Sequence, residues 1–333
     1  MVEPAPPAWQ VWTALGLVYV VWGSTYLAIR YVVETVPSFL GAGLRFLCAA
    51  LLLTAYLAIR RGRVAFRATR RQVLGAAGVG LLLLLGGNGG VTLAEQRHLP
   101  SGLTALVVAG VPLYVVVFRA VAHDRPGRGT LLGVAIGFLG LAVLLLPGSR
   151  PAGVSAGPAL LVVGSSFLWA VGSFVASRID LPKDPLWTTT VQMVGGGLGL
   201  LLAAAAHGES WQPGRVSLVS AVNLAYLVVF GSIVAFTSYS WLLRVAPVSK
   251  VATYAYVNPV VAVLLGALVA GEKVGLTAVV GGAVTVLAVA VVVSGEGRRQ
   301  PSVPVDAPLV SGDQAGDDQA PDDRQARDRS SST

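Results

Sequence analysis

One arginine stands deep inside a long apolar stretch, where a charge needs a partner. Arg45 is the ninth residue of the run 37–58, so a helix there would place it ~12 Å from the nearer end. Because an arginine near the centre of a membrane helix costs on the order of 3 kcal/mol, we expect it to face a cavity or a partner. Its planar guanidinium suits an anion such as a carboxylate. The other interpretation is a structural clamp to a backbone carbonyl, Glu34 or Glu95, and the sequence leaves both open.

Glu95 follows the apolar run 72–94 and has Arg97 and His98 close by. Such a carboxylate could bind and release a coupling proton, but we favour a solvated loop carboxylate at this position. The three histidines, His98, His123 and His207, lie at expected helix ends or loops without a second histidine nearby, so no metal site is predicted. The single cysteine excludes an intrachain disulfide and a CxxC metal site, and no cofactor is expected.

Polar and aromatic residues inside other apolar runs are candidates for the lining of a substrate cavity. They are Trp22, Ser24, Tyr26, Asn88, Trp169, Tyr254 and Asn258. For Trp22, Ser24 and Tyr26, ordinary packing or a place in an interfacial belt is the alternative. Pro112 and Pro259 stand within two further runs at matched depths. Since a proline inside a helix removes a hydrogen bond and kinks the chain, we expect both to interrupt their helices at a binding site or hinge.

Long apolar segments must position these side chains. Hydrophobic residues make up 54% of the chain, charged residues 12%, and the mean hydropathy is +0.72, whereas a soluble domain carries about 25% charged residues. A helix needs about 20 apolar residues to cross the hydrocarbon, and only helices or closed barrels satisfy their backbone in lipid. The composition therefore predicts an all-α polytopic membrane protein with ten transmembrane helices. We place them at 12–31, 37–58, 72–94, 99–120, 129–147, 156–177, 186–206, 217–242, 248–270 and 274–293.

The loops indicate the orientation of the chain. Lysine and arginine gather after the second, fourth, sixth, eighth and tenth spans, and the opposite loops carry few. By the positive-inside rule, both termini are cytoplasmic in a multi-pass protein of the cytoplasmic (inner) membrane. The basic pI therefore reflects topology, and no nucleic acid is expected as a partner. Residues 294–333 are rich in Asp, Pro, Gly, Ser and Gln, which predicts a disordered cytoplasmic tail.

The sequence contains an internal repeat with a period near 147 residues. Arg97–Pro112 (RHLPSGLTALVVAGVP) aligns with Arg244–Pro259 (RVAPVSKVATYAYVNP), and Trp22 then falls on Trp169. Because each copy has five helices, an odd number, the two copies enter the membrane from opposite sides. Such inverted repeats are typical of transporters that bind substrate between the copies. We expect secondary transport by alternating access; a non-saturating channel and a non-transporting scaffold are the alternatives.

The sequence speaks against a motor or an enzyme. The run GGNGG (Gly86–Gly90) lies inside an apolar stretch and no Walker lysine follows it, so it is not a nucleotide-binding loop. A membrane enzyme would need clustered aspartates or a Ser/His pair within a span, and the sequence has neither. The expected partners are a small-molecule substrate and the lipid bilayer. Either a monomer or a homodimer would be consistent with ten helices.

Four segments resemble the EamA-type branch of the drug/metabolite transporter superfamily. They are WGSTYLAIRY (Trp22–Tyr31), PSFLGAGLRF (Pro37–Phe46), Pro100–Val116 and Pro247–Glu272. The resemblance implies two EamA-type five-helix repeats, at 12–147 and 156–293, a central cavity between them, and export of small metabolites such as amino acids, or of drugs. The second repeat reads LWAVGSF at Leu168–Phe174, without the Trp-Gly pair of the first, so the two halves are not equivalent there.

Overall fold

The computed structural model describes residues 6–123, 126–146, 155–246, 251 and 253–297, and every regular element within them is helical, as predicted. All of them belong to one compact unit, Met1–Gln300. The first half contains α1 (Ala8–Val32), α2 (Ser38–Arg61), η1 (Gly62–Phe66), α3 (Arg70–Gly80), η2 (Leu81–Gly89), α4 (Gly90–Gln96), α5 (Ser101–Val108), α6 (Val111–Val121) and α7 (Arg128–Leu145). The second half contains α8 (Ala156–Ala176), α9 (Pro185–Ala206), η3 (Pro213–Arg215), α10 (Leu218–Tyr226), η4 (Leu227–Val234), α11 (Ala235–Val245), α13 (Tyr254–Ala270) and α14 (Leu276–Gly297).

Nine helical stretches of the described chain are long and apolar enough to cross a membrane, and α13 is a shorter apolar helix. The predicted ninth span starts at 248, but α13 starts at Tyr254, and residues 247–250 and 252 lie outside the described residues. At the C-terminal end, α14 continues to Gly297. The predicted start of the tail at 294 is therefore wrong, because residues 294–297 belong to α14. The rest of the predicted tail, 298–333, lies outside the described residues.

Prolines mark several helix starts. Pro37 and Pro100 are the N-caps of α2 and α5, and Pro185 is the first residue of α9. Proline is tolerated at these positions because the first backbone N–H groups of a helix have no intrahelical partner. Asp184, the N-cap of α9, accepts hydrogen bonds from the N–H groups of Leu186 (2.9 Å) and Trp187 (3.3 Å).

The two prolines expected to break their helices behave differently. The fourth apolar segment is interrupted at Ala109–Gly110, and α6 begins directly afterwards with Pro112 in its first turn. In contrast, α13 runs through Pro259 without a break. The expected interruption at Pro259 is therefore absent. A glycine precedes Pro112 by two residues, where the helix can end at low cost, whereas Val257 and Asn258 precede Pro259.

Two segments are π-helical, and they lie in the third span of each sequence repeat. One is η2, which joins α3 to α4, and the other is η4, which joins α10 to α11. A π-helix has i→i+5 hydrogen bonds and is rare in proteins. Where such segments occur, they are frequently found at functional sites. Their neighbours are therefore of particular interest.

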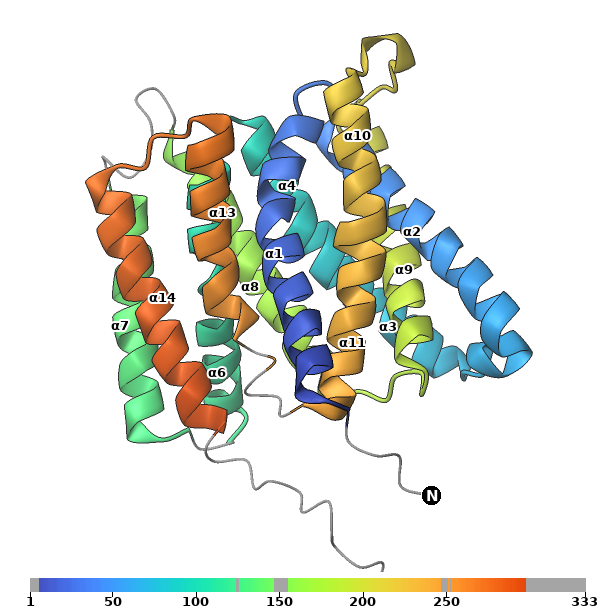
Figure 1. Ribbon diagram of the computed structural model, residues 1–333, viewed down its shortest axis with the longest axis horizontal. Coiled ribbons are helices and arrows are strands. Elements are labelled where there is room, and N and C mark those ends of the chain that lie inside the picture. Colours follow the sequence, from blue (N-terminus) through green and yellow to red (C-terminus); the bar gives the residue numbers. More distant parts are fainter. Residues whose placement is uncertain (1–5, 124–125, 147–154, 247–250, 252, 298–333) are drawn as a thin grey trace, which may run out of the picture. The chain divides into compact units, whose positions relative to one another are not determined.

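Helix packing joins the two halves of the chain throughout the unit. α2 packs on α9 and α7 on α14, and α7 and α14 run side by side in Figure 1. α1 packs on α10, η4, α11 and α13, and its counterpart α8 packs on α3, η2, α4, α5 and α6. Each contact of α1 with the second half thus has a matching contact of α8 with the first half. Two copies of one five-helix unit that are related by a twofold axis would give this pattern.

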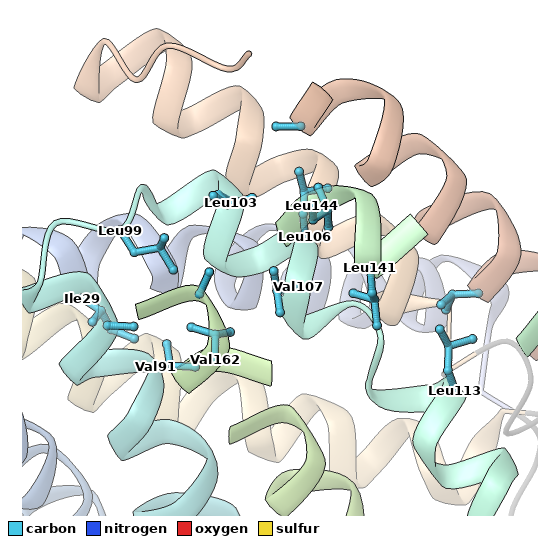
Figure 2. Packing of buried hydrophobic residues seen from close by; sticks show 14 of the residues in the cluster. Ile29, Val91, Leu99, Leu103, Leu106, Val107, Leu113, Leu141, Leu144 and Val162 are labelled. Atoms are coloured by element: carbon cyan, nitrogen blue, oxygen red, sulfur yellow. The ribbon is translucent and has the colours of Figure 1, made fainter. Parts of the chain in front are cut away.

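The largest buried apolar cluster collects side chains from both halves. Figure 2 shows members of this cluster, among them Ile29, Val91, Leu106, Leu141 and Val162. Large apolar side chains also cover much of the outer surface, including Leu51, Ile59, Leu202 and Leu268. In a soluble protein such a surface would aggregate, whereas lipid solvates it without cost. The unit is therefore apolar both inside and outside.

Glycine allows the closest approach between helices of the two halves. A Cβ added to Gly80 would lie 2.1 Å from the carbonyl oxygen of Gln192, and one on Gly196 would lie 2.6 Å from the carbonyl oxygen of Gly80. The backbones of α3 and α9 thus touch at these two glycines. Small residues permit such contacts between membrane helices. They fix η2, which follows Gly80, against the second half.

Candidate functional site

Arg45 lies in the first half of α2 and is buried, with 5% of its surface exposed. Its Nε donates a hydrogen bond to the hydroxyl of Ser232 (3.0 Å), and its guanidinium carbon lies 4.8 Å from the centre of the Phe46 ring. Within the described residues, neither Glu34 nor Glu95 pairs with it, and the two ion pairs join Arg30 to Glu272 and Arg61 to Asp184. The predicted clamp to Glu34 or Glu95 is therefore wrong.

A small cavity is lined in part by Arg45. Its lining comes from α1, α2, η2, α4, α10 and η4, and consists of Ile29, Val32, Gly41, Ala42, Arg45, Asn88, Thr92, Leu224 and Leu227. The volume is about 10 Å³, which is space for about one water molecule. Arg45 and Asn88, which are far apart in sequence, are thus brought to one cavity. We call it the Arg45 cavity. It is closed to any larger molecule in this conformation.

The π-helical segment η4 holds Arg45 and Trp22 side by side. The indole N–H of Trp22 donates to the carbonyl oxygen of Gly231 (3.2 Å), and the next residue, Ser232, accepts from Arg45. A Cβ on Gly231 would lie 3.2 Å from Arg45 Nη2, a tight contact that would require the guanidinium to shift by a few tenths of an ångström. Sequence reasoning missed Gly231 and Ser232, because their partners are far away in the chain. A mid-span serine in the charge-free stretch 216–243 was the available signal.

Trp22 also joins Tyr254 in an aromatic cluster. Its ring lies 5.2 Å from the rings of Phe236, Tyr239 and Tyr254, in edge-on or tilted arrangements that aromatic pairs prefer. One turn beyond Tyr254, the side chain of Asn258 is buried, and with its amide turned so that the nitrogen faces acceptors it donates to the carbonyl oxygens of Tyr19 (3.2 Å) and Tyr254 (3.3 Å). These contacts place Tyr254 and Asn258 at the interface of α1 and α13, so they do not line the Arg45 cavity.

The remaining candidates from the apolar runs have separate surroundings. The hydroxyl of Ser24 lies 2.6 Å from the Tyr226 hydroxyl, and Tyr26 packs against the largest apolar cluster. Trp169 packs on η2, where a Cβ on Gly87 would lie 2.7 Å from its ring. Trp22 and Trp169, equivalent in the sequence repeat, thus each contact the π-helical segment of the opposite half. Asn88 follows Gly87, and its carbonyl oxygen accepts from Thr92 (2.8 Å).

Glu95 lies near the end of α4 and is 3% exposed. The interpretation as a solvated loop carboxylate is therefore wrong. Neither of its carboxylate oxygens has a hydrogen-bond partner among the described residues. A second cavity, of about 330 Å³, lies beside it, and we call it the Glu95 cavity. It is lined by Arg30, Val33, Glu34, Glu95, Gln96, His98, Leu99, Pro100, Ala270, Gly271, Glu272 and Lys273.

Glu272 closes one side of the Glu95 cavity and ties three elements together. Its carboxylate pairs with Arg30 of α1 and accepts hydrogen bonds from the Ser101 N–H (2.9 Å), the Ser101 hydroxyl (2.9 Å) and the Gly102 N–H (3.1 Å) at the start of α5. Burial alone would raise the pKa of Glu272, but the hydrogen bonds from Gly102 and Ser101 and the pair with Arg30 hold that pKa below its usual value. The sequence did not single out either Glu272 or Arg30.

These side chains can bind small polar groups but offer no obvious centre for covalent chemistry. Arg45 presents Nη1 and Nη2, which make no hydrogen bond to other described residues, and Glu95 presents two free oxygens. No group of three or more His, Cys, Asp or Glu within the described residues could hold a metal ion. The arrangement is thus one buried arginine and one buried glutamate, each lining its own cavity between the halves.

Known proteins resemble this chain over nearly all of its described length. The model of the EamA-like transporter family matches residues 10–146 and 157–294. The chain is 39% identical over 297 residues to YedA of Escherichia coli K12, named as an uncharacterized inner membrane transporter, covering 89% of this chain and 94% of that protein. It is 25% identical to a probable amino-acid metabolite efflux pump of Salmonella typhimurium, covering 77% and 85%. A crystal structure at 19% identity shares the fold, with a TM-score of 0.58 over 89% of this chain and 100% of that one.

Proposed function

Because the chain belongs to the EamA-like transporter family, we propose that it is a secondary transporter that exports small carboxylate-bearing metabolites by alternating access, with Arg45 holding the carboxylate. Membrane transport is the activity of the family. The direction, the substrate class and the role of Arg45 belong to this proposal. The relative named as a probable amino-acid metabolite efflux pump supports both export and a carboxylate-bearing substrate.

The observation that carries the proposal is a buried arginine without a carboxylate partner among the described residues. A charge in such a place costs several kcal/mol unless it is paired and hydrogen-bonded. Arg45 makes one hydrogen bond, to a neutral hydroxyl, which leaves most of its positive charge uncompensated. A substrate carboxylate would supply the missing anion, and the guanidinium fork can bind both of its oxygens.

The conformation of the Arg45 cavity fits a carrier better than a pore. With a volume of about 10 Å³, the cavity has to expand before a metabolite can enter it. In alternating access, this expansion happens from one side of the membrane at a time, as the two repeats rock against each other. The closed cavity is then one state of the cycle. A non-saturating channel, the second candidate, would instead need a continuous aqueous path.

The proposed topology is ten membrane-spanning helices in two inverted five-helix repeats, with both termini in the cytoplasm. The matched contacts of α1 and α8 with opposite halves support it, and so does the gathering of basic residues on one side. Accessibility of tags at the two ends, measured in right-side-out and inverted vesicles, tests this arrangement. Ends found on opposite faces would exclude it.

The function is tested by uptake and counterflow in proteoliposomes. We expect saturable counterflow of carboxylate-bearing metabolites by the wild type, and no uptake of the corresponding amides. Arg45→Ala should raise the half-saturation concentration roughly 10- to 150-fold, the equivalent of a charge-assisted hydrogen bond of about 1.5–3 kcal/mol. Arg45→Lys should recover part of the loss, and Arg61→Ala, at an exposed ion pair, serves as the control. Normal transport by Arg45→Ala would refute the assigned role, and non-saturating flux would favour a channel.

A further inference from the structure

Glu95 is the second buried ionisable group without a charged partner among the described residues. The carboxylate is almost completely shielded from solvent, both oxygens lack a hydrogen-bond donor among the described residues, and the Glu95 cavity adjoins it. Burying a carboxylate without a donor costs several kcal/mol. The group therefore needs either a proton or a cation, and the cavity provides the space through which either can arrive.

The charged neighbours of Glu95 do not supply that cation. Arg30 on α1 is its nearest basic neighbour, but this guanidinium already pairs with Glu272. The helices α5 and α8 and the segment η2, which pack against α4, contain no ionisable residue, and Arg45 of α2 is directed to Ser232. The other titratable groups on this side are Tyr26, Glu34, His98 and Lys273.

Glu95 also lies close to the Arg45 cavity along the same helix. Thr92, which lines the Arg45 cavity, precedes Glu95 by three residues on one face of α4, a separation of about 4.5 Å along the axis. Ile29 and Arg30, neighbours on α1, line the two cavities in the same order. The two cavities are therefore neighbours along α1 and α4, and a small molecule can reach from Arg45 to Glu95 only when the space between them opens.

We propose that Glu95 binds the ammonium group of a substrate whose carboxylate is held by Arg45, and that a proton takes its place once the substrate has left. The inference rests on the proposed function. An ammonium group and a proton both neutralise the carboxylate, so they compete for it. The proton comes from water in the Glu95 cavity, forms an O–H bond at a carboxylate oxygen, and returns to water on the other side of the membrane when the next substrate binds. No electron is transferred. Export of one substrate is thereby coupled to entry of one proton.

A metal cation fits the site less well than these two ligands. Sodium, magnesium and calcium need several oxygen ligands around them. Glu95 is the carboxylate here that is free to bind, since Glu272 is occupied by Arg30 and by the start of α5. Glu34 lines the same cavity but is exposed, so water satisfies it. A proton or a single ammonium group needs only one such carboxylate.

Proton release upon substrate binding tests the proposal directly. We expect the protein, in detergent and weak buffer, to release protons when an amino acid is added. It should release none when the corresponding carboxylate without an amino group is added. Glu95→Gln should abolish this release, whereas Glu34→Gln, the matched control at the same cavity, should retain it. Infrared difference spectra provide a readout independent of transport, because a protonated Glu95 contributes a carboxylic acid C=O band that Glu95→Gln lacks.

Transport by Glu95→Gln separates this inference from the proposed function. In proteoliposomes the variant should lose accumulation of amino acids driven by a pH gradient, whereas Glu34→Gln, at the same cavity, should keep it. Retained pH-driven accumulation would overturn the role of Glu95, and so would a sodium requirement or a missing carboxylic acid band. Loss of pH-driven accumulation by Glu34→Gln as well would overturn it too, because the effect would then not be specific to Glu95. Failure of the wild type to transport any carboxylate would instead refute the proposed function.

Discussion

The carboxylate of Glu272 offers a direct test of how the ends of the helices are held together. It accepts four bonds, from Arg30, the Ser101 N–H, the Ser101 hydroxyl and the Gly102 N–H. One oxygen accepts the first three bonds and the other accepts the bond from Gly102. The change Glu272→Gln keeps the size and one oxygen acceptor but removes the charge. The NH₂ group of the glutamine must then replace one of the two oxygens. It would face either the Gly102 N–H or the donors of Arg30 and Ser101.

The size of the effect follows from the bonds that are lost. With the amide nitrogen toward Gly102, one charge-assisted hydrogen bond disappears, worth about 1.5–3 kcal/mol. The loss of a negative charge at the start of α5 adds about 0.3–1 kcal/mol. Arg30 is partly exposed, so water can solvate it after the change. We therefore expect a loss of about 2–4 kcal/mol, a roughly 30- to 800-fold fall in the ratio of folded to unfolded protein.

Reversible unfolding in mixed micelles measures this loss. Asp184→Asn is the comparison, because Asp184 also caps a helix and pairs with an arginine, but at a more exposed site. Asparagine caps helices nearly as well as aspartate, and an exposed ion pair contributes under about 1 kcal/mol, so this variant should change stability by less than that. Equal effects of the two substitutions would refute the reasoning, since burial would then make no difference to the value of the cap.

The pH dependence gives the same test from the other side. The folded-state pKa of Glu272 lies below its unfolded value of 4.5, so the carboxylate contributes its full stabilisation above the unfolded pKa. That contribution is lost as the pH falls through the lower, folded-state pKa. Wild-type stability should therefore fall more steeply below pH 4.5 than that of Glu272→Gln. Parallel curves for the two proteins would contradict the assigned hydrogen bonds.

Two further substitutions examine the contact surfaces between the halves. Gly80→Ala should destabilise the protein by roughly 1–3 kcal/mol, since its Cβ would lie 2.1 Å from the Gln192 carbonyl oxygen, whereas Gly78→Ala, with open space around it, should be neutral or stabilising in the same unfolding assay. Trp22→Phe should cost about 0.5–1.5 kcal/mol through loss of the bond to the Gly231 carbonyl oxygen, and the exposed Trp9→Phe should cost less. Thermal unfolding followed by indole fluorescence measures both pairs. A variant and its control that lose equal stability would contradict the prediction for that pair.

Much of the fold could be predicted from local sequence, because lipid imposes a simple rule on length and hydropathy. The apolar runs coincide with helices to within a few residues, and Pro37, Pro100 and Pro185 stand at helix starts. The π-helical geometry of Leu81–Gly89 and Leu227–Val234 could not be predicted, since an apolar run does not distinguish i→i+5 from i→i+4 hydrogen bonds. The same holds for Pro259, whose helix is continuous although Pro112 follows a break.

The site was less predictable, because its members meet across the two halves. The sequence identified Arg45 as a charge in need of a partner, but its partner Ser232 is an ordinary mid-span serine. The burial of Glu95 depends on α1, α5 and α8, which pack around the end of α4, and loop position alone suggested the opposite. Glu272 was not selected because its four donors come from α1 and from the start of α5. Local patterns carry no information on such contacts.

The exchange of partners between Trp22 and Trp169 has a consequence for how the chain has to be made. Each tryptophan contacts the π-helical segment of the other repeat. In the same way, α2 packs against α9 and α7 packs against α14. A fragment that ends in the loop after α7 would insert with these surfaces bare. If the N-terminal and C-terminal halves were synthesised together as separate chains, each would cover the exposed surfaces of the other. Either half alone would have to pair with a second copy of itself or be degraded. Although the sequence contains two similar copies, each copy therefore needs the other in order to assemble.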